Sequence, residues 1–158
     1  MRLLKSTAFF LLLCACVSAA ASNIGATRHA KARSAQQHRD RVISTRTVKG
    51  SLKGFEVGDY MHAVIKLQSG KEDSYFIGSP GLDYFLALHK GEPLTLTYQV
   101  VDSYIEQAGG VQRINRLSGA RAGKLTHAAW WKNMRAKHSF AQLDKMYGSL
   151  TEKYRLNP

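Results

Sequence analysis

Between residues 45 and 121, apolar side chains recur at every second position in several short runs, and this alternation constrains the fold more than any other feature. The clearest run covers residues 61–67, where Met, Ala, Ile and Leu alternate with His, Val and Lys. A period of two is typical of a strand with one buried face. The same pattern predicts further strands at residues 45–57, 74–77, 94–105 and 111–118.

One helix is predicted between the third and fourth strands. Ser79 is placed to cap its first turn, and Pro80 suits its first position. Gly91 is a residue type that ends helices. An apolar stripe recurs between them at helical spacing, formed by Leu82, Phe85, Leu86 and His89.

The predicted order is therefore three strands, a helix and two strands, and the first strand bends at Gly54, a residue type that permits a bulge. This order is similar to that of the OB fold, a five-stranded Greek-key barrel. We expect a mainly β protein with an OB-like barrel over residues 45–121; another small antiparallel barrel or an α+β sheet is the alternative. A barrel of this size buries little more than about 60% of the surface of its unfolded chain. Residues 122–158 are therefore expected to pack on it as a helical extension.

The extension predicts one or two helices. Thr126 suits the cap of a helix over residues 125–138. Gly148 interrupts the apolar stripe that follows, so two short helices or one long helix fit the pattern. Two pairs have the spacing of a capping box, Ser139 with Gln142 and Ser149 with Glu152.

Trp130 and Trp131 are neighbours in the first of these helices. Adjacent helical residues point about 100° apart, so both rings cannot share one face. We expect at least one ring to pack on the barrel and the other to be partly exposed. Stacking on a base or a sugar, beside Lys132 and Arg135, is the functional alternative.

Residues 1–21 have the pattern of a secretory signal peptide, and residues 22–44, which are basic and poor in large apolar residues, predict a flexible linker. The only cysteines are Cys14 and Cys16. A lipobox-like sequence would make Cys16 a lipidation site and a membrane tether; otherwise both cysteines belong to the apolar run of the signal. In either case no disulfide braces the fold. The expected location is the periplasm or cell envelope of a bacterium, or secretion from another source.

Positive charge is concentrated towards the two ends of the chain, whose formal net charge is +12. Residues 108–158 contain ten Lys or Arg against two acids, whereas residues 47–107 contain five Lys against eight acids. The densest predicted basic surface comprises Arg113, Arg116, Arg121 and Lys124. The ligand face that an OB fold would provide on its second and third strands adds Tyr60, His62, Lys66 and Tyr75.

The sequence carries none of the nucleotide-binding or hydrolase motifs, and its six histidines have no pair at zinc-ligand spacing. We therefore expect no catalytic residue, no metal and no cofactor. The interpretation is an exported, non-catalytic binding or envelope-assembly module that engages an anionic macromolecule or an envelope protein, with nucleic acid as a further partner class. The alternatives are a small inhibitor or immunity-type protein that binds one specific protein, and an exported OB-fold nuclease similar to the thermonuclease family, whose acid and arginine motif is not found.

Overall fold

The computed structural model describes residues 40–156, so the predicted signal peptide, Cys16 and nearly all of the predicted linker lie outside the described residues. The prediction of a mainly β protein with C-terminal helices is confirmed. In chain order, the elements are β1 (Arg41–Val57), β2 (Met61–Leu67), β3 (Glu72–Ile77), α2 (Leu82–Leu88), β4 (Leu94–Ile105), a 3-10 turn (Glu106–Ala108), β5 (Gly110–Ala122), β6 (Leu125–Thr126), α3 (His127–Lys137) and α4 (Phe140–Lys153).

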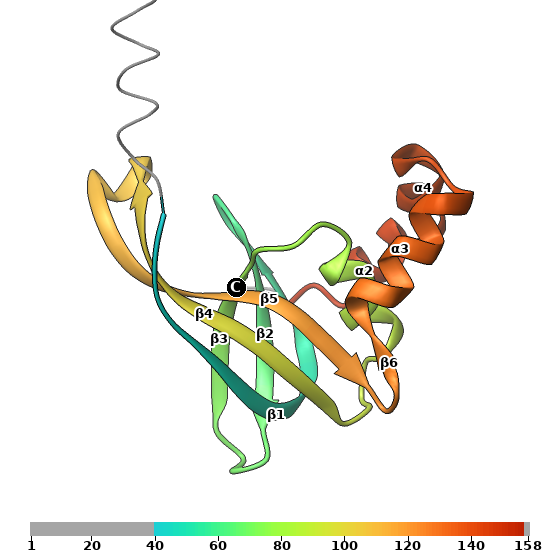
Figure 1. Cartoon of the computed structure of the whole chain (residues 1–158), viewed down its shortest axis with the longest axis horizontal. Coiled ribbons are helices and arrows are strands. Elements are labelled where there is room, and N and C mark those ends of the chain that lie inside the picture. The colour runs from blue at the N-terminus through green and yellow to red at the C-terminus, as the bar shows by residue number, and fades with distance from the viewer. Residues whose placement is uncertain (1–39, 157–158) are drawn as a thin grey trace, which may run out of the picture. The chain divides into compact units, whose positions relative to one another are not determined.

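Five of the strands form a closed ring (Figure 1). Neighbours in the order β3-β2-β1-β4-β5 pair antiparallel, and a parallel pairing of β3 with β5 closes the ring. Because alternate side chains of a strand point to opposite faces, each strand places every second residue in one shared interior. The ring contributes to the core, among others, Leu52, Ile65, Leu96 and Leu117.

β1 begins at Arg41, before the predicted start at residue 45. Residues 41–44 pair with the end of β4, where Arg41 lies opposite Asp102. The prediction that the linker extends to residue 44 is therefore wrong for these last residues. Their composition is typical of a linker, but β4, a strand distant in sequence, pairs with one edge of these residues and holds them in the sheet.

The bend predicted at Gly54 is confirmed, since the register of β1 against β2 shifts between Leu52 and Gly54. The end of the chain crosses β1 at this bend. The N–H of Phe55 donates to the carbonyl of Tyr154 at 3.0 Å, and the N–H of Leu156 donates to the carbonyl of Phe55 at 2.7 Å. A Cβ on Gly54 would lie 2.5 Å from the Tyr154 carbonyl oxygen, so glycine permits this close approach.

Helix α2 begins at Leu82, later than the predicted start at Pro80. Ser79 does not cap it, because the Ser79 hydroxyl donates instead to the carbonyl of Ser118 at 2.9 Å. Gly81 occupies the cap position with φ of 70°, a left-handed conformation that favours glycine. The ring of Trp131 covers Gly81 so closely that a Cβ there would lie 2.2 Å from a ring carbon.

The two C-terminal helices begin at the predicted caps. The Thr126 side chain accepts from the N–H of Ala129, and Ser139 forms a complete capping box with Gln142. The second capping box, at Ser149 and Glu152, is wrong: α4 runs through Gly148 without a break, so both residues lie inside one helix. Continuous packing of α4 against the core compensates for the low helix propensity of glycine.

The C-terminal helices cover α2, which in turn lies against the ring. The rings of Phe85 and Trp130 have centroids 5.6 Å apart, and Trp130 is 8% exposed. Leu143 of α4 is fully buried. Trp131 is half-buried, so the expectation of one packed and one partly exposed tryptophan agrees with the structure.

Replacing Gly54 with alanine tests the crossing of the chain end. The added methyl group would displace Tyr154 and Leu156, so we expect Gly54→Ala to lower the free energy of unfolding by about 1–3 kcal/mol. Urea titration measures the change. Gly58→Ala is the matched control, since a Cβ at Gly58 has no atom within 4 Å; equal effects of the two substitutions would contradict the crossing.

His127, which is 5% exposed, links α3 to the start of α2. Its Nε2 lies 3.1 Å from the carbonyl oxygen of Pro80. A carbonyl only accepts, so the neutral ring carries its proton on Nε2. Burial lowers the pKa of His127 from its ordinary value of 6.5, and the hydrogen bond to Pro80 partly opposes this shift.

This lowered pKa predicts a loss of stability in mild acid. As pH falls below 6.5, the unfolded chain takes up a proton at His127 that the folded chain does not, so the free energy of unfolding decreases. Urea titrations at pH 7.5 and 5.5 measure the decrease. We expect His127→Asn to make it smaller, and an unchanged pH dependence in that variant would contradict the assignment.

Candidate functional site

The four cations of the predicted basic surface do not form one patch. Roughly 30 Å of strand separates Arg113, near the start of β5, from Ala122 at its end. Arg121 is an exposed residue at that far end, and Lys124 lies exposed in the turn that follows. The predicted surface is therefore divided along the length of one strand.

Carboxylates neutralise the first two of these cations. Arg113 donates to both oxygens of Asp102 at 2.8 and 3.2 Å, and Arg41 donates to the same carboxylate at 3.0 Å. Hydrogen bonds from Arg113 and then Arg41 lower the pKa of Asp102. Asp102 thus serves two guanidinium groups at the end of the β4–β5 hairpin.

Arg116 is also paired. Its guanidinium binds the carboxylate of Asp40, which accepts a further hydrogen bond from the Ser103 hydroxyl at 2.6 Å. The bond from Ser103 is the largest cause that lowers the pKa of Asp40, whereas burial opposes the shift. Arg116 therefore ties the first described residue to β5, and its charge is balanced locally.

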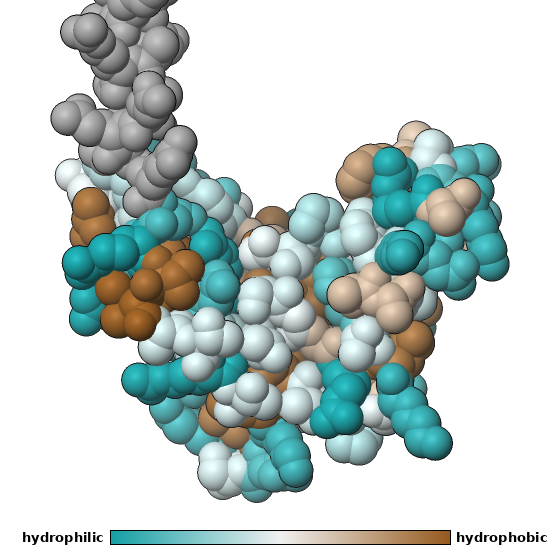
Figure 2. Space-filling model, viewed as in Figure 1, coloured by the Kyte–Doolittle hydropathy of each residue, from teal (hydrophilic) through white to brown (hydrophobic). Residues whose placement is uncertain are grey.

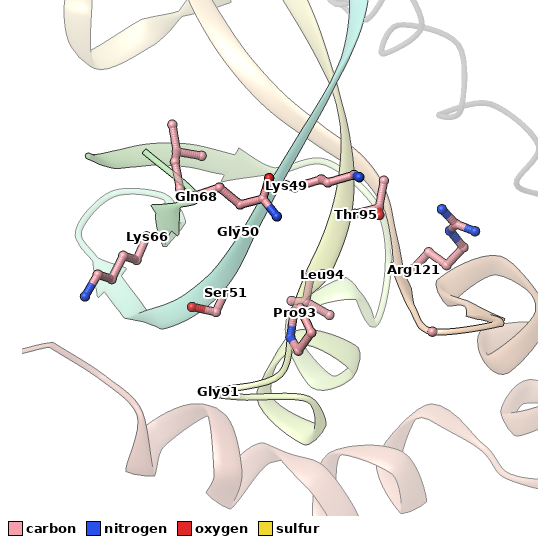
Figure 3. A pocket seen from close by; sticks show the side chains of 12 residues that line it. Lys49, Gly50, Ser51, Lys66, Gln68, Gly91, Pro93, Leu94, Thr95 and Arg121 are labelled. Carbon is pink, nitrogen blue, oxygen red and sulfur yellow. The ribbon is translucent and has the colours of Figure 1, made fainter. Parts of the chain in front are cut away.

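A wide groove of about 620 Å³ collects cations from three strands (Figure 3). Lys49 of β1, Lys66 of β2 and Arg121 of β5 line it. Among residues 40–156, no carboxylate oxygen lies within 4.0 Å of the charged nitrogens of these three side chains. We call this surface the basic groove.

Strand register builds the basic groove. Lys49 lies opposite Thr95, which lies opposite Arg121, so the three form a row across β1, β4 and β5. Residues opposite each other in antiparallel strands share a face of the sheet. Figure 3 shows the Lys49 ammonium directed towards Thr95, with Arg121 beyond it, while the Lys66 side chain extends from β2 on the opposite side of β1. The charges therefore surround the groove rather than converge on one atom.

Gly50 allows β1 and β2 to approach closely in this groove. A Cβ on Gly50 would lie 2.5 Å from the carbonyl oxygen of Lys66 and 2.8 Å from Cγ2 of Ile65. Ile65 is fully buried, so the missing side chain of Gly50 faces the interior, and glycine at this position permits the close packing of β1 on β2 beneath the groove.

Tyr60 and His62 belong to a different site, at the opposite end of β2 from Lys66. The rings of His62 and Phe76 have centroids 4.1 Å apart, and those of Tyr60 and Phe76 lie 5.8 Å apart. A hollow of about 430 Å³ beside them is lined by Tyr60, Phe76 and Asp83, among others. Phe76 is not among the residues predicted from the sequence, because only the register of β2 and β3 places it opposite His62.

Hydrogen bonds fix the tautomer of His62. The Ser74 hydroxyl donates to Glu56 at 3.3 Å and lies 3.2 Å from Nδ1 of His62. Because the single hydroxyl proton is used by Glu56, Nδ1 donates to Ser74. Burial lowers the pKa of His62, and the charge of Glu56 opposes this shift. The acid contacts the serine rather than the histidine, so the trio does not have the order of a nucleophilic triad.

Tyr75 is not on the predicted ligand face. It is 1% exposed, packs edge-on against Tyr98 at 5.0 Å between centroids, and has its pKa raised to about 12, chiefly by burial. Ser74 and Phe76 occupy the outer face of β3, and strand alternation therefore directs Tyr75 inwards. Its ring is not accessible to a ligand on the surface.

Within residues 40–156, no group of three or more His, Cys, Asp or Glu side chains is placed to hold a metal ion. The same residues contain no helix that is long and apolar enough to cross a membrane. Comparisons with protein-family models, curated proteins and solved structures gave no match for this chain.

Proposed function

We propose that this protein is a non-catalytic binding module built on an OB-like Greek-key barrel, and that its basic groove receives an anionic macromolecule. The order of the closed ring, with α2 between β3 and β4, supports the OB-like assignment. The sequence pattern of residues 1–21 supports export to a cell envelope or beyond.

The observation that carries the proposal is the difference between paired and unpaired cations. Arg41, Arg113 and Arg116 each have a carboxylate partner within the fold. Lys49, Lys66 and Arg121, by contrast, line the basic groove with no such partner among residues 40–156. Like charges gathered without acids repel one another, and a bound polyanion removes this repulsion.

A second candidate function, binding to one specific protein, is favoured by an apolar surface at the end of the β4–β5 hairpin. Val42, Ile43 and Val111 are 48%, 43% and 62% exposed there. Figure 2 shows brown apolar surface at this end of the molecule. Exposed aliphatic side chains that lie together are typical of protein interaction sites.

The proposal predicts retention on immobilised heparin, a sulfated polyanion, that depends on the basic groove. Replacing Lys49, Lys66 and Arg121 together with alanine removes three contacts of roughly 0.5–1 kcal/mol each. We therefore expect the triple variant to bind soluble heparin about tenfold or more weakly, as measured by calorimetry at fixed salt.

The matched control removes the same number of charges from cations that have carboxylate partners. Lys53, Lys71 and Arg113 pair with Glu72, Asp73 and Asp102. Alanine at these three positions is expected to change heparin affinity by less than about threefold, because their charges are already balanced. If both triple variants lose affinity equally, net charge and not the groove governs binding.

A further inference from the structure

One edge of β1 is open over the first half of the strand. β4 pairs with β1 from Arg41 to Gly50, and β2 pairs with the opposite edge only from Gly50 to Val57. The chain end occupies the β4-side edge at Phe55, beyond the last β4 pair. Among residues 40–156, no strand pairs with the β2-side edge of residues 41–48.

A hydrogen bond shows which residues present their backbone to this open edge. The N–H of Gln68, the residue after β2, donates to the carbonyl of Lys49 at 3.2 Å. In an antiparallel sheet, the N–H and C=O of one residue point to the same side and alternate along the strand. Thr45 and Thr47 therefore present both groups outwards, whereas Arg46 and Val48 bond to β4.

The open edge is suited to adding a strand. Thr45 and Thr47 have exposed side chains, and residues 41–49 contain no proline or glycine and are rich in β-branched residues. The register shift in β1 lies between Val42 and Ser44, so the pairing with β4 is regular from Ser44 onwards. Exposed edges of this kind are templates for pairing with another chain.

Charge and apolar surface select the partner. Arg41, Arg46 and Lys49 are the ionisable residues of this half of β1, and all are cationic. A second copy of the chain would place these cations opposite one another, which is destabilising. A peptide that carries carboxylates has the complementary charge and also supplies backbone groups, which polysaccharides and nucleic acids cannot align along a strand edge. The exposed Val42 and Ile43 at the far end of the edge favour a protein partner as well.

We propose that an extended, acidic segment of a partner protein adds to the sheet along residues 44–49 of β1. Its backbone exchanges hydrogen bonds with Thr45 and Thr47, and its carboxylates lie near Lys49, on the face of the sheet that Lys49 shares with both threonines. This proposal rests on the proposed function in one respect, because Lys49 also lines the basic groove. The two can be separated, since only strand addition uses the backbone of Thr47.

The test uses a ten-residue peptide in which Glu alternates with Val, labelled with a fluorophore, and measures its affinity by anisotropy. Thr47→Pro removes an outward N–H without removing a bond to β4, and proline is tolerated at strand edges. We expect Thr47→Pro to weaken peptide binding at least about tenfold, because the peptide loses a hydrogen-bond donor and meets the proline ring in its place. Thr47→Ala keeps the N–H and is the matched control, with affinity within about threefold of the unchanged protein.

A second measurement does not depend on the folding of a variant. We expect amide hydrogen exchange of the free protein to be fast at Thr45 and Thr47 and slow at Arg46 and Val48, and we expect saturating peptide to slow exchange at both threonines. The same peptide methylated on alternate backbone nitrogens of its pairing edge no longer binds. If saturating peptide leaves hydrogen exchange at Thr45 and Thr47 unchanged, the proposal is overturned.

The remaining outcomes distinguish the two proposals. Thr47→Pro leaves heparin affinity unchanged, because heparin makes no backbone pair with β1. If both triple variants change heparin affinity equally while Thr47→Pro still weakens peptide binding, the proposed function is overturned and strand addition stands. Equal binding of a peptide in which Lys replaces Glu, or a dimer that Thr47→Pro dissociates, would overturn strand addition by an acidic segment.

Discussion

The burial of Phe85 between the ring and the C-terminal helices is the interaction on which the rest of the structure depends. Its ring is fully buried and lies within 6 Å, between centroids, of Trp130 and His127 on α3. The sequence has no cysteine after Cys16, so no disulfide braces residues 40–156. A ring of this size buries little more than about 60% of the surface of its unfolded chain, so it is only marginally stable on its own. The helices extend its core through Trp130, which belongs to the same apolar cluster as the strands.

This arrangement determines which surfaces remain accessible. The helices cover α2, and the chain end occupies the edge of β1 beside Gly54. The basic groove and the open edge of β1 are among the surfaces that stay exposed, and Lys49 belongs to both. The second half of β1 therefore contributes side chains to the core. Its first half exposes unpaired backbone groups and cationic side chains to solvent. The pairing pattern that closes the ring thus also leaves one edge of β1 unpaired among residues 40–156.

Local features of the sequence were sufficient to predict the strands, the bend at Gly54 and the two C-terminal caps, because alternation and capping depend on neighbouring residues. Long-range features were not predictable. The basic groove requires the register that places Lys49 and Arg121 in one row, and nothing local reveals the Asp102 that neutralises Arg113. The prediction that Tyr75 lies on the outer face was wrong for a related reason. Tyr75 belongs to a run of three apolar residues, so the sequence alone does not show which of them point inwards until the pairing with β2 is known.

The most direct test of this account is the thermal unfolding of a chain that ends at Lys124, compared with the full chain. Removing α3 and α4 exposes Phe85 and deletes Trp130 and Leu143, two buried side chains whose loss costs roughly 3–5 and 2–5 kcal/mol. Since 1 kcal/mol corresponds to a few degrees in Tm for a domain of this size, the account predicts a Tm lower by at least about 10 °C, or no cooperative transition. A shortened chain that remains monomeric and unfolds cooperatively at the same temperature would contradict it.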